Sequence, residues 1–197
     1  MADFPITIKP RSVRISSIHQ TNVSVAHSLR QVVSDRGGHR WMFELDFPPM
    51  SRADFAPLWA FIVSQRGRFG TFNLTLPEHA ALGTMAGTPV VFGEDQSGRT
   101  LTVSGFTNSA NPPLKAGDFI RIAGSYKAHM VTADLDVSTG TSFPLAIEPA
   151  LQDTPADAAA VSADGVFRCA LTSDSHAVDV STAAHYGFTL QLVEVLS

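Results

Sequence analysis

Cysteine, strong charge and long apolar runs are all scarce in this sequence. Its 197 residues contain one cysteine, Cys169, so no internal disulfide forms, and its place in the apolar run 166–171 predicts a buried small hydrophobe. The formal charge is −4 and the 14 Lys and Arg form no basic cluster, which argues against a nucleic-acid partner. No segment approaches the roughly 20 apolar residues that cross a bilayer, and residues 1–6 lack a secretion signal, so we expect no membrane insertion.

Motifs for catalysis and metal binding are missing as well. The sequence has no nucleophile elbow, no phosphate-binding loop and no paired-histidine zinc motif. Its seven histidines are dispersed, although strand pairing can bring two together. Asp174, Ser175 and His176 are adjacent, but triad members converge in space whereas neighbours on an extended chain point apart, so we interpret them as a polar turn.

A pair of carboxylates gives no stronger signal. Asp134 and Asp136 share one face of an extended segment, but they precede Ser138-Thr139-Gly140, where Asp, Ser and Gly are typical turn residues. We therefore expect a protein that is not an enzyme, with no catalytic residue, no cofactor and no metal.

Strand patterns dominate what is present. Residues 40–47 alternate strictly, with the apolar side chains of Trp41, Phe43, Leu45 and Phe47 on one face. The preceding residues 23–33 have strand character, and 34–39 contains Gly37-Gly38 and other turn formers. We predict an antiparallel hairpin that turns at 34–39.

One helix is expected after Pro48-Pro49. Its apolar face has helical spacing and consists of Phe55, Leu58, Trp59 and Ile62. We predict a helix at about 54–66 that packs this face on the sheet and places Trp41 and Trp59 in the core. Asp54 is favoured over Ser51 as N-cap, because Pro57 then falls in the first turn, and Gly67 ends the helix.

The remaining chain predicts a discontinuous β core around an inserted unit. Short β runs separated by Gly, Asn, Pro and Ser fill 88–152 and favour a small barrel or sandwich, whereas 152–164 has the composition of a linker. The apolar terminal strand 186–196 needs neighbours and is expected to rejoin the N-terminal sheet. The predicted fold is mainly β (α+β), a sandwich or open sheet with one packed helix: a core of 1–87 plus 153–197 and an insertion at 88–152.

One stretch of the insertion resembles a β element of phage virion proteins. It comprises 114–124 with Gly117-Asp118, 127–134, Thr139-Gly140 and 145–151 with Pro149. Arg68-Phe69-Gly70-Thr71-Phe72 after the helix, and the chain end 188–196, are similar to minor tail proteins at the distal tail tip of long-tailed phages.

The resemblance implies a structural virion protein, assembled in the bacterial cytoplasm. Such proteins form homo-oligomeric rings, commonly hexamers, that join the tail tube to the hub or the receptor-binding apparatus. The alternative is a receptor- or carbohydrate-binding module of a phage adhesion device, for which Tyr126 and Lys127 in the loop 124–127 are the candidate exposed contacts.

Overall fold

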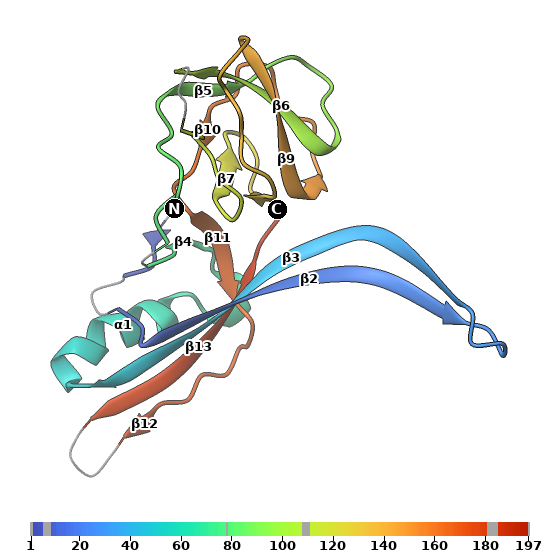
Figure 1. The fold of residues 1–197 in the computed structure, drawn as a ribbon. Helices are drawn as coiled ribbons and strands as arrows, with labels where there is room; N and C mark the ends of the chain where they lie inside the picture. The colour runs from blue at the N-terminus through green and yellow to red at the C-terminus, as the bar shows by residue number, and fades with distance from the viewer. Residues whose placement is uncertain (1, 6–8, 78, 108–110, 181–184, 197) are drawn as a thin grey trace. The chain divides into compact units, whose positions relative to one another are not determined.

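The chain is mainly β with one α-helix in the residues that its computed structural model describes, which are 2–5, 9–77, 79–107, 111–180 and 185–196 (Figure 1). It divides into two compact units, Met1–Phe72 with Cys169–Val195, and Asn73–Arg168 with Leu196–Ser197. The expected boundaries lay near 87 and 153. The chain leaves the first unit in strand β4 and returns in β11.

The elements fall into two sheets and one helix. The first sheet contains β1 (Ala2–Asp3), β2 (Ser12–Val25), β3 (Gln31–Met50), β4 (Phe72–Thr75), β11 (Val166–Leu171), β12 (Asp179–Val180) and β13 (Tyr186–Glu194). The second contains β5 (Gly87–Val91), β6 (Gly98–Phe106), β7 (Phe119–Ile122), β8 (Ala128–Val131), β9 (Ser142–Leu151) and β10 (Val161–Ser162). Helix α1 spans Arg52–Ser64, and a short 3-10 helix, η1, spans Gly67–Phe69.

The C-terminal strand lies in the middle of the first sheet, whose order is β1-β4-β11-β13-β3-β2. β13 pairs antiparallel with β3, so that Leu190 lies opposite Leu45 and Leu192 opposite Phe43. The expected return of this strand to the N-terminal sheet is therefore confirmed. Since all four residues are buried, the pairing joins sequence-distant apolar faces into one core.

The N-terminal hairpin turns earlier than predicted. β2 pairs with β3 so that Val23 lies opposite Val33, and the turn is closed by hydrogen bonds between Ala26 and Arg30 and from Leu29 N–H to the Ala26 carbonyl. The predicted turn at 34–39 is wrong. Gly37, with φ of 71°, instead forms an irregularity within β3, which two glycines accommodate at little cost.

The N-cap of helix α1 lies three residues before the expected one. Ser51, not Asp54, is the N-cap: its hydroxyl accepts a hydrogen bond from Asp54 N–H at 3.3 Å and donates one to the Asp54 carboxylate at 2.7 Å. Pro57 consequently lies inside the helix, where it cannot donate to the carbonyl of Ala53. The helix includes Pro57 nevertheless, and the Ser51 hydroxyl satisfies one of its first backbone N–H groups.

The predicted apolar face of α1 packs on the sheet through aromatic contacts. Phe188 of β13 stacks on Phe47 of β3, with ring centroids 4.9 Å apart, and meets Phe55 of α1 edge-on at 5.6 Å. Trp41 is buried as expected, but Trp59 is only partly buried and lies at the margin of the core, against Phe55. Placing Trp59 in the core was therefore wrong.

The second unit is a nearly closed barrel of order β10-β7-β8-β9-β6-β5, one of the two forms that the spacing of its short runs predicted. Val90 bridges to Ala160, and Val91 exchanges backbone hydrogen bonds with Ala158 and Ala159, which joins the two ends of the sheet. The segment 152–164 is thus not a linker. It supplies β10 and closes the barrel, with Val161 in the core.

Substitution of Phe188, whose ring lies where β13, β3 and α1 meet, tests this packing. Replacing Phe188, which is buried and contacts both Phe47 and Phe55, by Ala should lower the free energy of unfolding by about 3–5 kcal/mol. The matched control is Phe69→Ala, because Phe69 is 82% exposed and its loss should cost less than about 0.5 kcal/mol. Denaturant unfolding measures both; equal effects would contradict the placement of β13.

Candidate functional site

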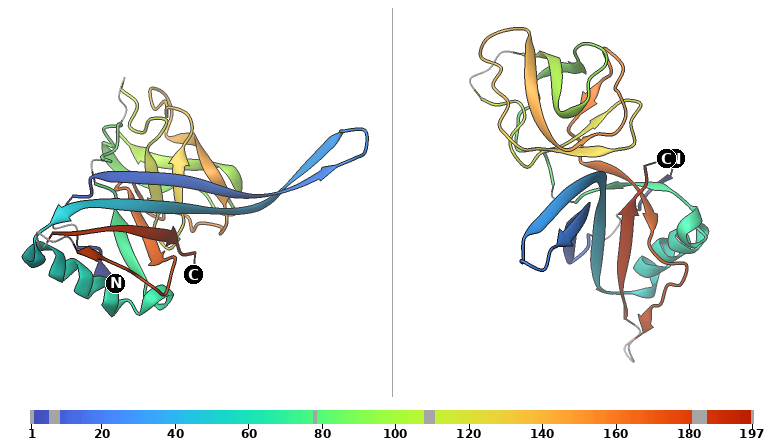
Figure 2. Two further views of the ribbon diagram at one scale, coloured as in Figure 1. Left: turned by 90° about the horizontal axis from the view of Figure 1, so that it is seen from below. Right: turned by 90° about the vertical axis from the view of Figure 1, so that its right-hand side faces the viewer.

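The most distinctive surface of the first unit is the end of the β2–β3 hairpin. Every residue from Ser17 to Gly37 is exposed, and the ribbon extends past the rest of its sheet (Figures 1 and 2). We call residues 20–38 the arm. The sequence did not reveal it, because valines that alternate with polar residues also occur in strands with one buried face.

One face of the arm carries three valines, beside Thr21, Gln31 and Asp35. Val23 and Val33 lie opposite each other, and Val25 follows on the same face because strand side chains alternate; their exposed fractions are 49%, 56% and 59%. The other face carries Asn22, Ser24 and Ser34 around one valine, Val32. We call the surface of Val23, Val25 and Val33 the valine face. The turn adds Leu29, which is 84% exposed.

The base of the arm is held by a polar cluster. Strand pairing places His19 opposite His39, and the hydroxyl of Ser17 hydrogen-bonds to Nε2 of both rings, at 3.1 and 2.8 Å. His39 is buried and meets the ring of Trp41 at 4.7 Å, while the backbone N–H of Trp41 donates to the buried Glu194 carboxylate at 3.2 Å. The cluster ties β2, β3 and β13 together where the core ends.

A second apolar surface lies between α1 and the strands β12 and β13. The cavity measures about 740 Å³, and its walls include Phe55, Ala56, Trp59, Ala60, Val63 and Val178. Val63 is 59% exposed, and Tyr186 closes one side by stacking on Phe55 at 4.8 Å. We call this surface the helix groove.

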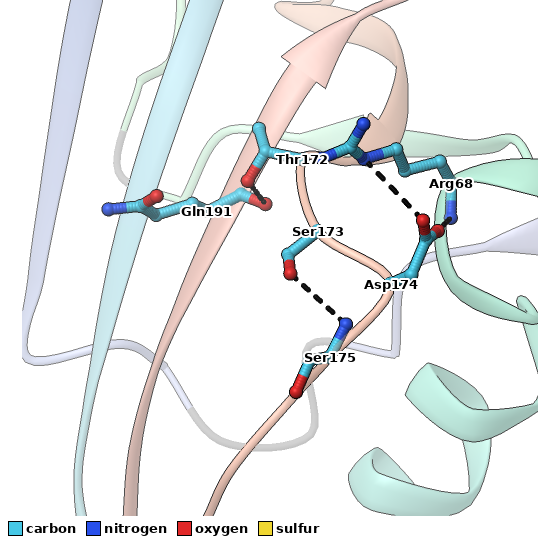
Figure 3. Close-up of polar contacts among 6 residues, drawn as sticks. All are labelled: Arg68, Thr172, Ser173, Asp174, Ser175 and Gln191. Atoms are coloured by element: carbon cyan, nitrogen blue, oxygen red, sulfur yellow. Dashed lines mark hydrogen bonds and ion pairs between the residues drawn. The ribbon is translucent and has the colours of Figure 1, made fainter.

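The adjacent residues Asp174, Ser175 and His176 do not assemble into a triad. Asp174 accepts a hydrogen bond from Arg68 N–H at 3.0 Å and lies 4.0 Å from its guanidinium, while Ser175 N–H donates to the Ser173 hydroxyl (Figure 3). The carboxylate therefore anchors η1. Interpreting this segment as a polar turn agrees with these contacts, and Thr172 fixes its start by donating to the Gln191 carbonyl at 3.2 Å.

The Gly-Asp pair of the virion-like element organises the barrel. Gly117 adopts φ of 99° and turns the chain into β7, as expected. The buried carboxylate of Asp118 accepts hydrogen bonds from the backbone N–H groups of Leu82, Gly83 and Lys115, at 2.6, 3.1 and 2.8 Å. Asp118 thus anchors two loops at the start of β7, which the motif alone did not reveal. The exposed Asp134 and Asp136 cap neighbouring turns through Ala116 and Ser138 N–H.

The two candidate contact residues in the loop 124–127 differ in exposure. Tyr126 is 49% exposed, and the guanidinium of Arg168 lies 4.0 Å from its ring centroid. Lys127 is only 2% exposed, so its expected place at the surface is wrong. Lys127 directly precedes strand β8, and its charge did not predict its burial.

Burial decides the ionisation of two groups in these sheets. Desolvation lowers the pKa of His129 to about 4; Lys127 adds to this effect, although a 2.8 Å hydrogen bond with the Pro149 carbonyl opposes it. Burial raises the pKa of the Cys169 thiol, and the charge of Glu194 adds to the rise. Cys169 is therefore an inert core residue, as its sequence context predicted.

Asp118→Asn tests the anchor of the barrel loops. The amide nitrogen would face N–H donors, so at least one charge-assisted hydrogen bond is lost and the free energy of unfolding should fall by about 2–4 kcal/mol. Asp134→Asn is the control, because exposed Asp134 accepts only the bond from Ala116 among those described above, and it should change stability by about 1 kcal/mol or less. Similar losses in the two variants would contradict the anchoring role.

The pKa of His129 makes stability depend on pH. Between pH 6.5 and about 4 the unfolded chain binds a proton that folded His129 does not, so stability should fall by up to about 3 kcal/mol as the pH drops through this window. His129→Gln should remove this part of the pH dependence, whereas His27→Gln, at an exposed position, should keep it. Urea unfolding at pH 7, 5.5 and 4.5 measures the slope, and an unchanged slope in His129→Gln would contradict the assignment.

No metal cluster, membrane-spanning helix or matching family adds to this picture for the residues that the structure describes. Among the residues that the structure describes, no group of three or more His, Cys, Asp or Glu is placed to hold a metal ion. No helix within the same ranges combines the length and apolarity needed to span a membrane. In the comparisons with known proteins, no family model matches the chain and no curated protein matches it.

Proposed function

We propose that this chain is a structural subunit of a phage tail tip that joins a ring of subunits through its arm. The observation that carries the proposal is a ribbon exposed from Ser17 to Gly37 with a valine face. An isolated two-stranded ribbon is marginally stable in water, and an uncovered apolar face favours association. Another protein therefore completes the arm.

The edge of the first sheet supports the same function. β2 is a 14-residue edge strand whose one charged residue at neutral pH is Arg14, and it contains neither lysine nor proline. Monomeric proteins usually protect such edges with charges, proline or a covering segment. The barrel, by contrast, joins its own edges through Val90 and Ala160.

The phage assignment rests on the resemblance around Gly117-Asp118 and on the similar flanks. In this role the ring joins the tail tube to the hub or receptor-binding proteins, and the subunit enters the virion from the host cytoplasm. The contacts of Asp118 give the motif a structural purpose, which suits a building block better than a catalyst.

A second candidate function is the binding of a receptor or carbohydrate. Trp59 borders a cavity of about 250 Å³ whose other walls carry Thr172, Ser173, Ser175 and Gln191. His176 also lines it, with a buried Nε2 that has no hydrogen-bond partner. An indole beside hydroxyl groups and an amide is an arrangement typical of sugar-binding sites.

The valine face provides a direct test of assembly. Replacing Val23, Val25 and Val33 by Thr keeps three β-branched residues in the arm but removes its apolar face. The wild-type chain should form a closed oligomer and the triple variant a monomer with an unchanged melting temperature, as measured by multi-angle light scattering and circular dichroism.

The matched control is Val32→Thr on the opposite face of the arm, which should still assemble. A second variant replaces residues 20–38 by Asn-Gly, so that His19 and His39 flank a two-residue turn. A monomeric wild-type chain, or an oligomer that survives both arm variants, would refute the proposed function.

A further inference from the structure

We propose that the helix groove of one copy binds the arm of a second copy, head to tail. This inference rests on the proposed assembly function and names the surface that receives the arm. Both surfaces belong to the first unit, and both expose apolar side chains that the chain itself leaves uncovered: the valine face on the arm, and Val63 beside Trp59 in the groove.

The arm cannot reach the groove of its own chain. β3 runs from Gln31 at the arm to Met50, and α1 starts two residues later, so the two surfaces lie at opposite ends of one strand (Figure 1). Twenty residues of strand span about 60 Å at about 3.3 Å per residue. The arm that fills the groove must therefore come from another molecule.

The groove matches the valines of the arm in chemistry. Its cavity of about 740 Å³ has walls that are mainly apolar, and the wall residues Ala56 and Ala60 leave room above the helix. The valine face and Leu29 present short apolar side chains on a narrow ribbon. Such side chains lose their contact with water in the groove, and burial of their apolar surface favours the contact.

The charges of the two surfaces are complementary in sign. The charged residues of the arm at neutral pH are Arg30, Asp35 and Arg36, which leave one net positive charge. The charged residue among the groove walls is Arg52, whereas the charged residue on the side of the valine face is Asp35, two residues from Val33 on the same strand, so the residues that would meet carry opposite charges. The attraction favours arm against groove over arm against arm, because two arms repel each other.

A contact between two different surfaces propagates from copy to copy. Each subunit offers one arm and one groove, so the contact is heterologous and closes into a ring if the rotation per subunit permits. Pairing of two arms about a two-fold axis would instead stop at a dimer. These alternatives predict different behaviour for mixtures of variants.

The groove is blocked by Ala60→Arg, which introduces a long charged side chain at an exposed helical position. Ala53→Arg is the matched control, since Ala53 is exposed on the same helix outside the groove walls. Arginine is a good helix former, so both variants should keep the wild-type melting temperature. Ala60→Arg should raise the dissociation constant of the oligomer at least tenfold, and Ala53→Arg should leave it unchanged.

The decisive experiment mixes two defective full-length variants. Ala60→Arg keeps its arm, and the triple Thr variant keeps its groove, so the mixture has one intact interface and should yield a 1:1 heterodimer by mass photometry. A mixture that stays monomeric, or Ala60→Arg that assembles like the wild type, would overturn the inference. If the triple Thr variant is monomeric while Ala60→Arg still assembles, the proposed function stands and only the groove is excluded as the receiving surface.

Discussion

The pairing of β3 with β2 on one side and with β13 on the other is the constraint on which the first unit depends. Over residues 42–46, β3 pairs with β2 on one side and β13 on the other and has a helix over one face, so alternate side chains are buried. Over residues 31–37 it has only β2, and both faces are exposed. One strand is therefore a core element at one end and an arm at the other, and the packed end holds the exposed end in register.

Polar contacts determine where each apolar region stops. The Ser17, His19 and His39 cluster lies where the first core ends, and Asp118 lies where the loops of the second core begin. Each group is satisfied by partners from other segments, so burial of a polar atom here ties segments together instead of weakening them. The same rule explains why neutral His129 is compatible with the barrel interior.

The features that were predicted correctly are those that follow directly from the spacing of apolar residues along the sequence. Burial of one face explains the alternation of 40–47, the helical spacing of 55–62 and the apolar strand at the chain end. The structure confirms all three elements. The hairpin turn was missed because a turn with Leu29 at positive φ lacks glycine, while Gly37-Gly38 suggested one in the wrong place. The closure by residues 158–160 uses backbone hydrogen bonds, which no side-chain pattern reveals. The helix groove depends on how far Trp59 extends past the core, and that is decided only by tertiary packing.

The neighbouring positions of β4 and β11 in the first sheet bear on how such a chain diversifies. The barrel begins after one of these strands and ends in the other, so its two connections start about 4.8 Å apart, the ordinary spacing of paired strands. A sheet with two such adjacent strands accepts any folded module whose ends lie side by side, and the hydrogen bonds of the sheet need not change. Exchange of the barrel for another folded domain would change the binding surface of the subunit and leave its contacts with neighbouring subunits unchanged.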